Sequence, residues 1–209
     1  MTISKLENSL VAVLRGKNEY NMHFLVESLL KGGITNIEIT LDTPDAFNVI
    51  KSIKKEFNNQ ILIGAGTVLD PTSAILAINA GAEFVVSPTL NTDVIKATKR
   101  HGKISIPGAL TPSEVLNAYE CGADVVKVFP AGSLGPNYIK DLKGPLSYIQ
   151  VMPTGGIGIE DVVDYFNAGA FTVGLGSSLI RHDLILEKKY NEISQLAKSY
   201  VDKISMVNR

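Results

Sequence analysis

The sequence predicts an α/β fold of parallel strands and helical crossovers, and specifically a single-domain (β/α)₈ barrel over residues 1–209. The first observation is a repeated joint, in which a helix ends at a glycine and a β-rich run follows, at Gly33, Gly81, Gly122 and Gly169. These glycines lie 48, 41 and 47 residues apart, which leaves room for about two strand–helix units in each interval. The second observation is the number of units, because eight β-rich runs each precede a helical stretch.

The elements follow one another without a linker or a low-complexity tract. The predicted strands lie near residues 11–15, 36–41, 61–68, 84–88, 104–109, 125–130, 149–153 and 171–176. The predicted helices lie near residues 19–31, 44–57, 71–79, 91–100, 112–120, 136–142, 159–167 and 184–203. Three helices are expected to begin with a capping residue followed by proline, at Thr43-Pro44, Asp70-Pro71 and Thr111-Pro112. The last predicted helix is amphipathic and closes the fold.

An open, doubly wound sheet is the structural alternative. Its usual nucleotide-binding signature, Gly-x-Gly-x-x-Gly at the start of the first helix, is missing after the first strand. The barrel is therefore the favoured fold.

Composition narrows the class of protein. A hydrophobic fraction of 45% and a charged fraction of 20% are typical of a globular protein with a sizeable core. A net charge of −1, few aromatic residues and no tryptophan argue against a nucleic-acid partner. No apolar run has membrane-spanning length, and no leader sequence is recognisable, so no membrane association is expected. The single Cys121 fits a reducing compartment, and we expect a cytoplasmic protein.

Two ionisable residues are predicted to point into the barrel. In the strand near 36–41, Ile37 and Ile39 suit the helix-facing side, and this alternation directs Glu38 inward. In the strand near 125–130, the same reasoning directs Lys127 inward. An isolated buried charge is costly, so each group needs a partner or a chemical role. A structural ion pair is one interpretation. Because both lie toward the carboxyl ends of their strands, a lysine nucleophile with a carboxylate acid/base is favoured.

Two glycine-rich loops predict a phosphate site. Gly155 and Gly156 follow the seventh strand, and Ser177 follows Gly176 at the end of the eighth. Barrels that bind phosphorylated substrates often use these two loops, where unhindered N–H groups converge on the anion. Arg15, at the end of the first strand, would neighbour the eighth strand and could add a charge-assisted contact. A rim ion pair is the alternative for Arg15.

Other polar residues carry weaker signals. Thr67 ends the third strand beside glycines, and the residues alone do not distinguish a ligand contact from an internally bonded hydroxyl. Pro88 is compatible with a simple turn. The histidines His23, His101 and His182 are scattered without metal-ligand spacing, so neither a metal ion nor a cofactor is expected.

These motifs together resemble those of the KDPG/KHG aldolases, which act on 2-keto-3-deoxy-6-phosphogluconate and 4-hydroxy-2-oxoglutarate. The likeness covers about residues 10–180 and touches every predicted strand. The motifs that carry it are Ala12-Val13-Leu14-Arg15, Ile37-Glu38-Ile39-Thr40, Gly64-Ala65-Gly66-Thr67-Val68, Val86-Ser87-Pro88, Ile106-Pro107-Gly108, Val126-Lys127-Val128-Phe129-Pro130 and Pro153-Thr154-Gly155-Gly156-Ile157. The resemblance implies a metal-independent class I aldolase, folded as a (β/α)₈ (TIM) barrel and assembled as a homotrimer.

The resemblance also implies a role for each site residue. Lys127 would form a Schiff base with the substrate, Glu38 would be the general acid/base, and Thr67 would bind the pyruvate carboxylate. Phe129 and Pro88 would form walls of the pyruvate pocket, and Thr154 would lie near the aldehyde end. The phosphate would be held by Arg15, Gly155, Gly156 and Ser177. The expected partners are a phosphorylated 2-keto-3-deoxy sugar acid and pyruvate.

One position departs from the family pattern. Many members have an arginine four residues after the glutamate, which helps to hold the carboxylate, but this chain has Asp42. Asp42 would instead be available to cap the helix that Pro44 is predicted to open. Three alternatives therefore stay open: the 6-phosphogalactonate epimer as substrate, an isomerase or synthase that uses no imine, and an inactive sugar-phosphate-binding relative.

Overall fold

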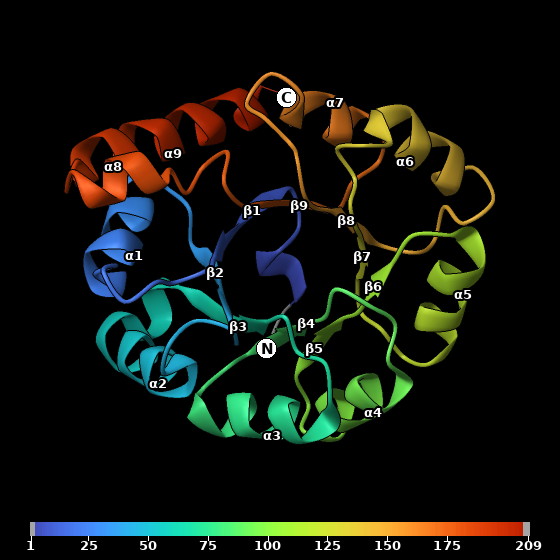
Figure 1. Cartoon of the computed structure of the whole chain (residues 1–209). Coiled ribbons are helices and arrows are strands. Elements are labelled where there is room, and N and C mark those ends of the chain that lie inside the picture. Colours follow the sequence, from blue (N-terminus) through green and yellow to red (C-terminus); the bar gives the residue numbers. More distant parts are fainter. Residues whose placement is uncertain (1–2, 207–209) are drawn as a thin grey trace.

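The computed structural model describes residues 3–206 and shows parallel strands arranged in a ring with helices around it (Figure 1). The strands are β1 (Ser9–Leu14), β2 (Asn36–Thr40), β3 (Leu62–Gly66), β4 (Phe84–Val86), β5 (Ile104–Ile106), β6 (Gly108–Ala109), β7 (Val126–Val128), β8 (Val151–Pro153) and β9 (Thr172–Leu175). The α-helices are α1 (Met22–Lys31), α2 (Ala46–Phe57), α3 (Pro71–Ala80), α4 (Thr92–Arg100), α5 (Pro112–Glu120), α6 (Gly135–Lys143), α7 (Val162–Asn167), α8 (His182–Leu186) and α9 (Tyr190–Ser205). Two short 3₁₀ helices are η1 (Ile3–Lys5) and η2 (Asn58–Gln60).

The strands form two parallel sheets. A six-stranded sheet has the order β5-β4-β3-β2-β1-β9, and a three-stranded sheet has the order β6-β7-β8. At one junction the chain passes directly from β5 to β6 through Pro107, which has no N–H to donate. At the other junction, a single parallel bridge joins Thr154 to Gly174, and the Phe171 N–H donates to the Val151 carbonyl at 2.9 Å. The parallel α/β fold is confirmed, with strand hydrogen bonds divided between two sheets and the predicted strand 104–109 split in two.

Two of the three predicted proline starts are correct. The Asp70 side chain accepts from the Ser73 N–H at the start of α3, and Thr111 and Glu114 form a capping box at the start of α5. The third prediction is wrong, because α2 begins at Ala46, after Asp45 in a left-handed conformation (φ 54°). The Thr43 hydroxyl instead accepts a hydrogen bond from the Gly16 N–H at 2.8 Å. A tertiary contact has taken the place of the local cap.

The closing helix also differs from the prediction. The segment near 184–203 divides into α8 and α9, because Lys188 adopts a left-handed conformation (φ 56°) between them. The Lys189 N–H then bonds to the Leu184 carbonyl at 2.8 Å, which ends α8. No helix within residues 3–206 is long and apolar enough to cross a membrane.

Apolar side chains pack in two layers. Ile37 and Ile39 belong to the larger cluster between strands and helices, together with Ile50 of α2. A smaller cluster fills the inside of the ring and includes Val11, Leu62, Phe84, Val86, Ile104, Ile106, Val125 and Met152. Leu6, just after η1, is fully buried in this inner cluster, and the amino-terminal segment lies inside the ring (Figure 1).

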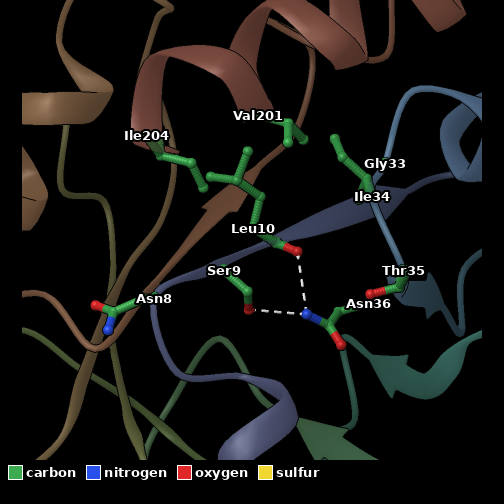
Figure 2. A pocket seen from close by; sticks show the side chains of 9 residues that line it. All are labelled: Asn8, Ser9, Leu10, Gly33, Ile34, Thr35, Asn36, Val201 and Ile204. Carbon is green, nitrogen blue, oxygen red and sulfur yellow. Dashed lines mark hydrogen bonds between the residues drawn. The ribbon is translucent and has the colours of Figure 1, made fainter. Parts of the chain in front are cut away.

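The amino ends of the strands are tied together by a buried asparagine. Asn36 donates through Nδ2 to the Ser9 hydroxyl at 2.8 Å and to the Leu10 carbonyl at 3.4 Å (Figure 2). It also donates to the Lys5 carbonyl at 3.1 Å. A cavity of about 140 Å³ lies beside these residues. These bonds anchor the amino-terminal segment to β2, at the end of the strands opposite Thr67 and Ser177.

Candidate active site

One pocket at the carboxyl ends of the strands brings together all ten residues that the sequence analysis selected. Its volume is about 380 Å³. The lining residues are Val13, Arg15, Glu38, Thr40, Thr67, Pro88, Lys127, Phe129, Thr154, Gly155, Gly156, Gly176, Ser177 and Ser178. The four that were not selected are Val13, Thr40, Gly176 and Ser178. Alternation along the strand could have found Val13 and Thr40, since each lies two residues from a selected side chain.

Lys127 and Glu38 reach the pocket from opposite sheets. Lys127 lies on β7 and is 6% exposed, whereas Glu38 lies on β2 and is fully buried. The Lys127 Nζ lies 5.1 Å from the centroid of the Phe129 ring, a cation–π geometry for a protonated amine. Within the described part of the chain, neither carboxyl oxygen of Glu38 has a hydrogen-bond partner. A hydrogen-bonded ion pair between Glu38 and Lys127 is therefore not formed among the described residues.

Burial sets the protonation of Glu38. Loss of solvent raises the pKa of this carboxyl above its ordinary value, because the charged form is disfavoured away from water. The nearby Lys127 and Arg15 act in the opposite direction but do not reverse the shift. A carboxyl group that holds its proton to higher pH is suited to donate and accept protons near neutrality.

Gly66 makes room for the Glu38 carboxyl. A Cβ atom at position 66 would lie 1.9 Å from Glu38 Oε1, so only glycine allows this side chain its place. The next residue, Thr67, has φ 56°, an unusual conformation for a β-branched residue. Strain of this kind persists where the surroundings impose it, and it is frequent at binding sites. Gly66, directly before Thr67, therefore gives room to the carboxyl group.

The two predicted phosphate loops meet at the same side of the pocket. Gly155 and Gly156 have φ values of 92° and 75°, which favour glycine. A Cβ atom on Gly155 would lie 2.9 Å from the Phe129 ring. Next to them, Thr154 donates through its hydroxyl to the Met152 carbonyl at 3.3 Å. The loops thus offer main-chain groups, free of obstructing side chains, beside Ser177.

Arg15 stands at the mouth of the pocket and pairs with Asp42. The Arg15 Nε lies 3.1 Å from Asp42 Oδ2, and both side chains are largely exposed. The expectation that Asp42 caps α2 is wrong, because that helix begins four residues later and has no side-chain cap. The rim pair that was the alternative for Arg15 is present, while Arg15 also lines the pocket.

The three histidines lie outside the pocket lining. His23 pairs with Glu56, His182 bonds to the Tyr20 hydroxyl at 2.6 Å, and His101 bonds to the Ala97 carbonyl at 2.8 Å. Among residues 3–206, no three His, Cys, Asp or Glu side chains gather closely enough to hold a metal ion.

Comparison with protein families gives the identity that this pocket suggests. The family model described as KDPG and KHG aldolase matches residues 3–196. The chain belongs to the KDPG and KHG aldolase family. The fold and the motifs around Lys127, Glu38 and Gly155 are therefore those of an aldolase family.

Two relatives in this family carry different substrate names. The chain is 33% identical to a 2-dehydro-3-deoxy-6-phosphogalactonate aldolase of Escherichia coli (strain K12), over 91% of this chain and 94% of the relative. It is 35% identical to a 2-dehydro-3-deoxy-phosphogluconate aldolase of Haemophilus influenzae, over 96% of this chain and 95% of the relative. Because the identity to both relatives is similar, these two comparisons do not distinguish between the two sugar-acid epimers.

A solved structure of the family is also similar. The KDPG aldolase from Legionella pneumophila, with pyruvate captured at low pH as a covalent carbinolamine intermediate, superposes with a TM-score of 0.84. Its sequence is 28% identical, and the match covers 93% of this chain and 95% of that one.

Proposed function

We propose that this chain is a class I aldolase that cleaves 2-dehydro-3-deoxy-6-phosphogluconate into pyruvate and glyceraldehyde 3-phosphate through a Schiff base on Lys127. The observation that carries the proposal is that one pocket contains both a buried lysine, Lys127, and a buried carboxyl group without hydrogen-bond partners, Glu38. The carbinolamine in the related Legionella pneumophila structure supports it. We further propose that the two sheets act together as one (β/α)₈ barrel, formed as a single domain.

The chemistry follows from these two groups. The neutral form of the Lys127 amine attacks C2 of the substrate, and protonated Glu38 then donates its proton to the carbinolamine hydroxyl, which leaves as water and gives an iminium ion and ionised Glu38. The iminium withdraws electrons from C3, so the C3–C4 bond breaks as ionised Glu38 takes the proton of the C4 hydroxyl. The aldehyde leaves, and its bonding electrons form an enamine. Protonated Glu38 then returns the proton to C3. Water hydrolyses the resulting iminium to pyruvate and free Lys127, and the proton released in this step returns to Glu38.

The remaining lining residues are assigned to the two ends of the substrate. Thr67 binds the carboxylate, with Phe129 and Pro88 forming the walls around the pyruvate unit. At the other end, Arg15 and Ser177 contact the phosphate together with the main chain of the loop at 155–156. Thr154 lies between these groups, beside the aldehyde carbons, where its hydroxyl influences stereoselectivity. Cleavage of 4-hydroxy-2-oxoglutarate to pyruvate and glyoxylate needs the same imine chemistry and belongs to the proposal.

Borohydride reduction tests the imine. Wild-type protein is treated with pyruvate and sodium borohydride, and the modified residue is located by peptide mass spectrometry. We expect one adduct on Lys127, which Lys127→Met abolishes. Lys143→Met is the matched control, because Lys143 is a partly buried lysine that donates to main-chain carbonyls of Ser147 and Ile149. No adduct on folded wild-type protein would favour a phosphate-binding barrel that uses no imine.

The 6-phosphogalactonate epimer is the second candidate substrate. The chain is about as similar to the Escherichia coli 2-dehydro-3-deoxy-6-phosphogalactonate aldolase as to the Haemophilus influenzae 2-dehydro-3-deoxy-phosphogluconate aldolase, so sequence identity supports the two epimers equally. Coupled detection of pyruvate from both epimers and from 4-hydroxy-2-oxoglutarate ranks the substrates by kcat/KM. If no pyruvate is released from any of the three compounds, the result would favour an inactive sugar-phosphate-binding protein.

We also propose that the chain assembles as a homotrimer. The family resemblance supports this assembly, and exposed apolar side chains such as Leu69 and Leu76 are available for a subunit contact. Sedimentation equilibrium measures the mass directly.

A further inference from the structure

The ion pair at the pocket mouth joins the ends of two neighbouring strands. Arg15 follows β1 and Asp42 follows β2, and these strands pair in parallel as far as Leu14 and Ile39. The Arg15 Nε lies 3.1 Å from Asp42 Oδ2, and the two side chains form an ion pair. Arg15 lines the pocket, whereas Asp42 does not. Asp42 is thus placed to affect a bound molecule through Arg15.

Arg15 has a special place among the charges of the pocket. Two of the fourteen lining residues are arginine or lysine, namely Arg15 and Lys127. Lys127 is buried in the interior and is assigned to the imine, whereas the Arg15 side chain is 66% exposed. A substrate whose carbonyl reaches Lys127 therefore presents its far end to Arg15. Arg15 is the cationic lining residue available to an anion there.

The geometry of the guanidinium decides how Arg15 can serve. A guanidinium carries five N–H donors in one plane, and an ion pair formed at the Nε side leaves both terminal nitrogens free to bind an anion in parallel. A long, exposed arginine has many rotamers, and ordering it on binding costs entropy. The ion pair with Asp42 favours one of these rotamers before the ligand arrives. Pre-ordering of this kind improves binding by reducing that cost.

We propose that Asp42 is a positioning residue that orients Arg15 toward the phosphate at the far end of the substrate. This inference rests on the proposed function, since it takes a phosphorylated substrate as given. Asp42 also has an opposing effect, because its negative charge repels the phosphate. The two effects are separable, since Asp42→Asn keeps a polar side chain of the same size beside Nε but removes the charge, whereas Asp42→Ala removes both.

The experiment measures aldol condensation of pyruvate with glyceraldehyde 3-phosphate and with unphosphorylated glyceraldehyde. We expect Asp42→Ala to raise KM for glyceraldehyde 3-phosphate about 2- to 5-fold, the range of an exposed ion pair. The KM for pyruvate and kcat should stay unchanged, because Lys127 and Thr67 are untouched. Asp42→Asn should give no increase, and glyceraldehyde should respond to neither variant. In an Arg15→Ala background, Asp42→Ala should have no further effect.

Several results would overturn the inference. An unchanged KM in Asp42→Ala would show that Asp42 does not position Arg15, and a lower KM in both variants would show that it only repels the anion. An effect that persists without Arg15, or that appears equally with glyceraldehyde, would place its cause elsewhere. Borohydride trapping of pyruvate on the same preparations separates the two proposals. A wild-type protein without the Lys127 adduct removes the proposed function, whereas an adduct with an unchanged KM removes only the role of Asp42.

Discussion

At the scale of single residues, the most unusual feature of the pocket is a buried carboxyl group without hydrogen-bond partners. Glu38 is fully buried and its oxygens lack partners among the described residues. A buried carboxyl group without partners lowers the stability of the fold, because buried polar atoms are ordinarily paired. The cost is understandable if the substrate provides the missing partners during catalysis.

The raised pKa of Glu38 predicts a pH-dependent stability. The folded protein holds this proton to higher pH than the unfolded chain, so the contribution of Glu38 to the free energy of unfolding falls as pH rises above about 4. Glu38→Gln cannot titrate. We expect its free energy of unfolding to rise relative to that of wild type between about pH 4 and about pH 8. Urea unfolding at the two pH values measures this difference. An identical pH dependence in the two proteins would contradict the assignment of the shift to Glu38.

Two glycines on β3 give a matched test of how the pocket is built. A Cβ atom on Gly66 would collide with the Glu38 carboxyl, whereas one on Gly64 would lie 2.3 Å from the Phe84 ring. We expect Gly66→Ala to reduce kcat about 100-fold, because misplacement of a reacting group by about 1 Å is that costly. Gly64→Ala should lose about 1–3 kcal/mol of stability through overpacking but keep its activity when folded. Equal loss of kcat in both variants would mean that Gly66 acts only through the core.

At the scale of elements, helix starts show when local sequence decides and when it does not. Asp70 and Thr111 cap α3 and α5 as their sequences predict, because both side chains are free to bond the first turn. Thr43 is likewise a capping residue type followed by proline, but its hydroxyl accepts a hydrogen bond from the N–H of Gly16, in a loop 27 residues away. A competing tertiary bond is invisible to a local pattern, so the start of α2 was predicted two residues too early.

The capping box of α5 predicts a stability effect without an effect on catalysis. Thr111→Ala removes the hydroxyl that accepts from the Glu114 N–H, and we expect it to lower the free energy of unfolding by about 1 kcal/mol. Thr111→Ser keeps the hydroxyl and should stay close to wild type. Chemical denaturation of the three proteins measures the difference, with kcat as an independent check. A destabilised serine variant would point to lost packing of the methyl group instead of the cap.

At the scale of the whole molecule, the ring of strands has a weaker and a stronger side. Register pairs join β1 to β2 and β2 to β3 over four and five residues, whereas one isolated bridge joins Thr154 to Gly174. A Cβ atom on Gly174 would lie 2.4 Å from the Thr154 hydroxyl oxygen, so this junction is also closely packed. The weaker side carries the loop at 155–156, where the phosphate is proposed to bind.

This difference predicts uneven hydrogen exchange. Amides with few ladder partners open at lower free energy than those inside a continuous sheet. We expect peptides covering residues 152–157 to exchange faster than peptides covering β2 and β3, as measured by mass spectrometry in the ligand-free protein. Equal protection of the two regions would show that side-chain packing compensates for the missing strand bonds.

The sequence by itself determined the order of strands and helices and the inward direction of Glu38 and Lys127, whereas Thr67, Pro88 and Thr154 were added to the site by the family resemblance. It could do so because alternation along a strand and the shared carboxyl edge of parallel strands are local and topological rules. The tertiary structure alone decided the division into two sheets, the start of α2 and the ion pair of Asp42 with Arg15. These depend on contacts between segments far apart along the chain, and such contacts compete with local preferences. The placement of Gly66 against Glu38 is of the same kind, because only folding brings β2 and β3 side by side.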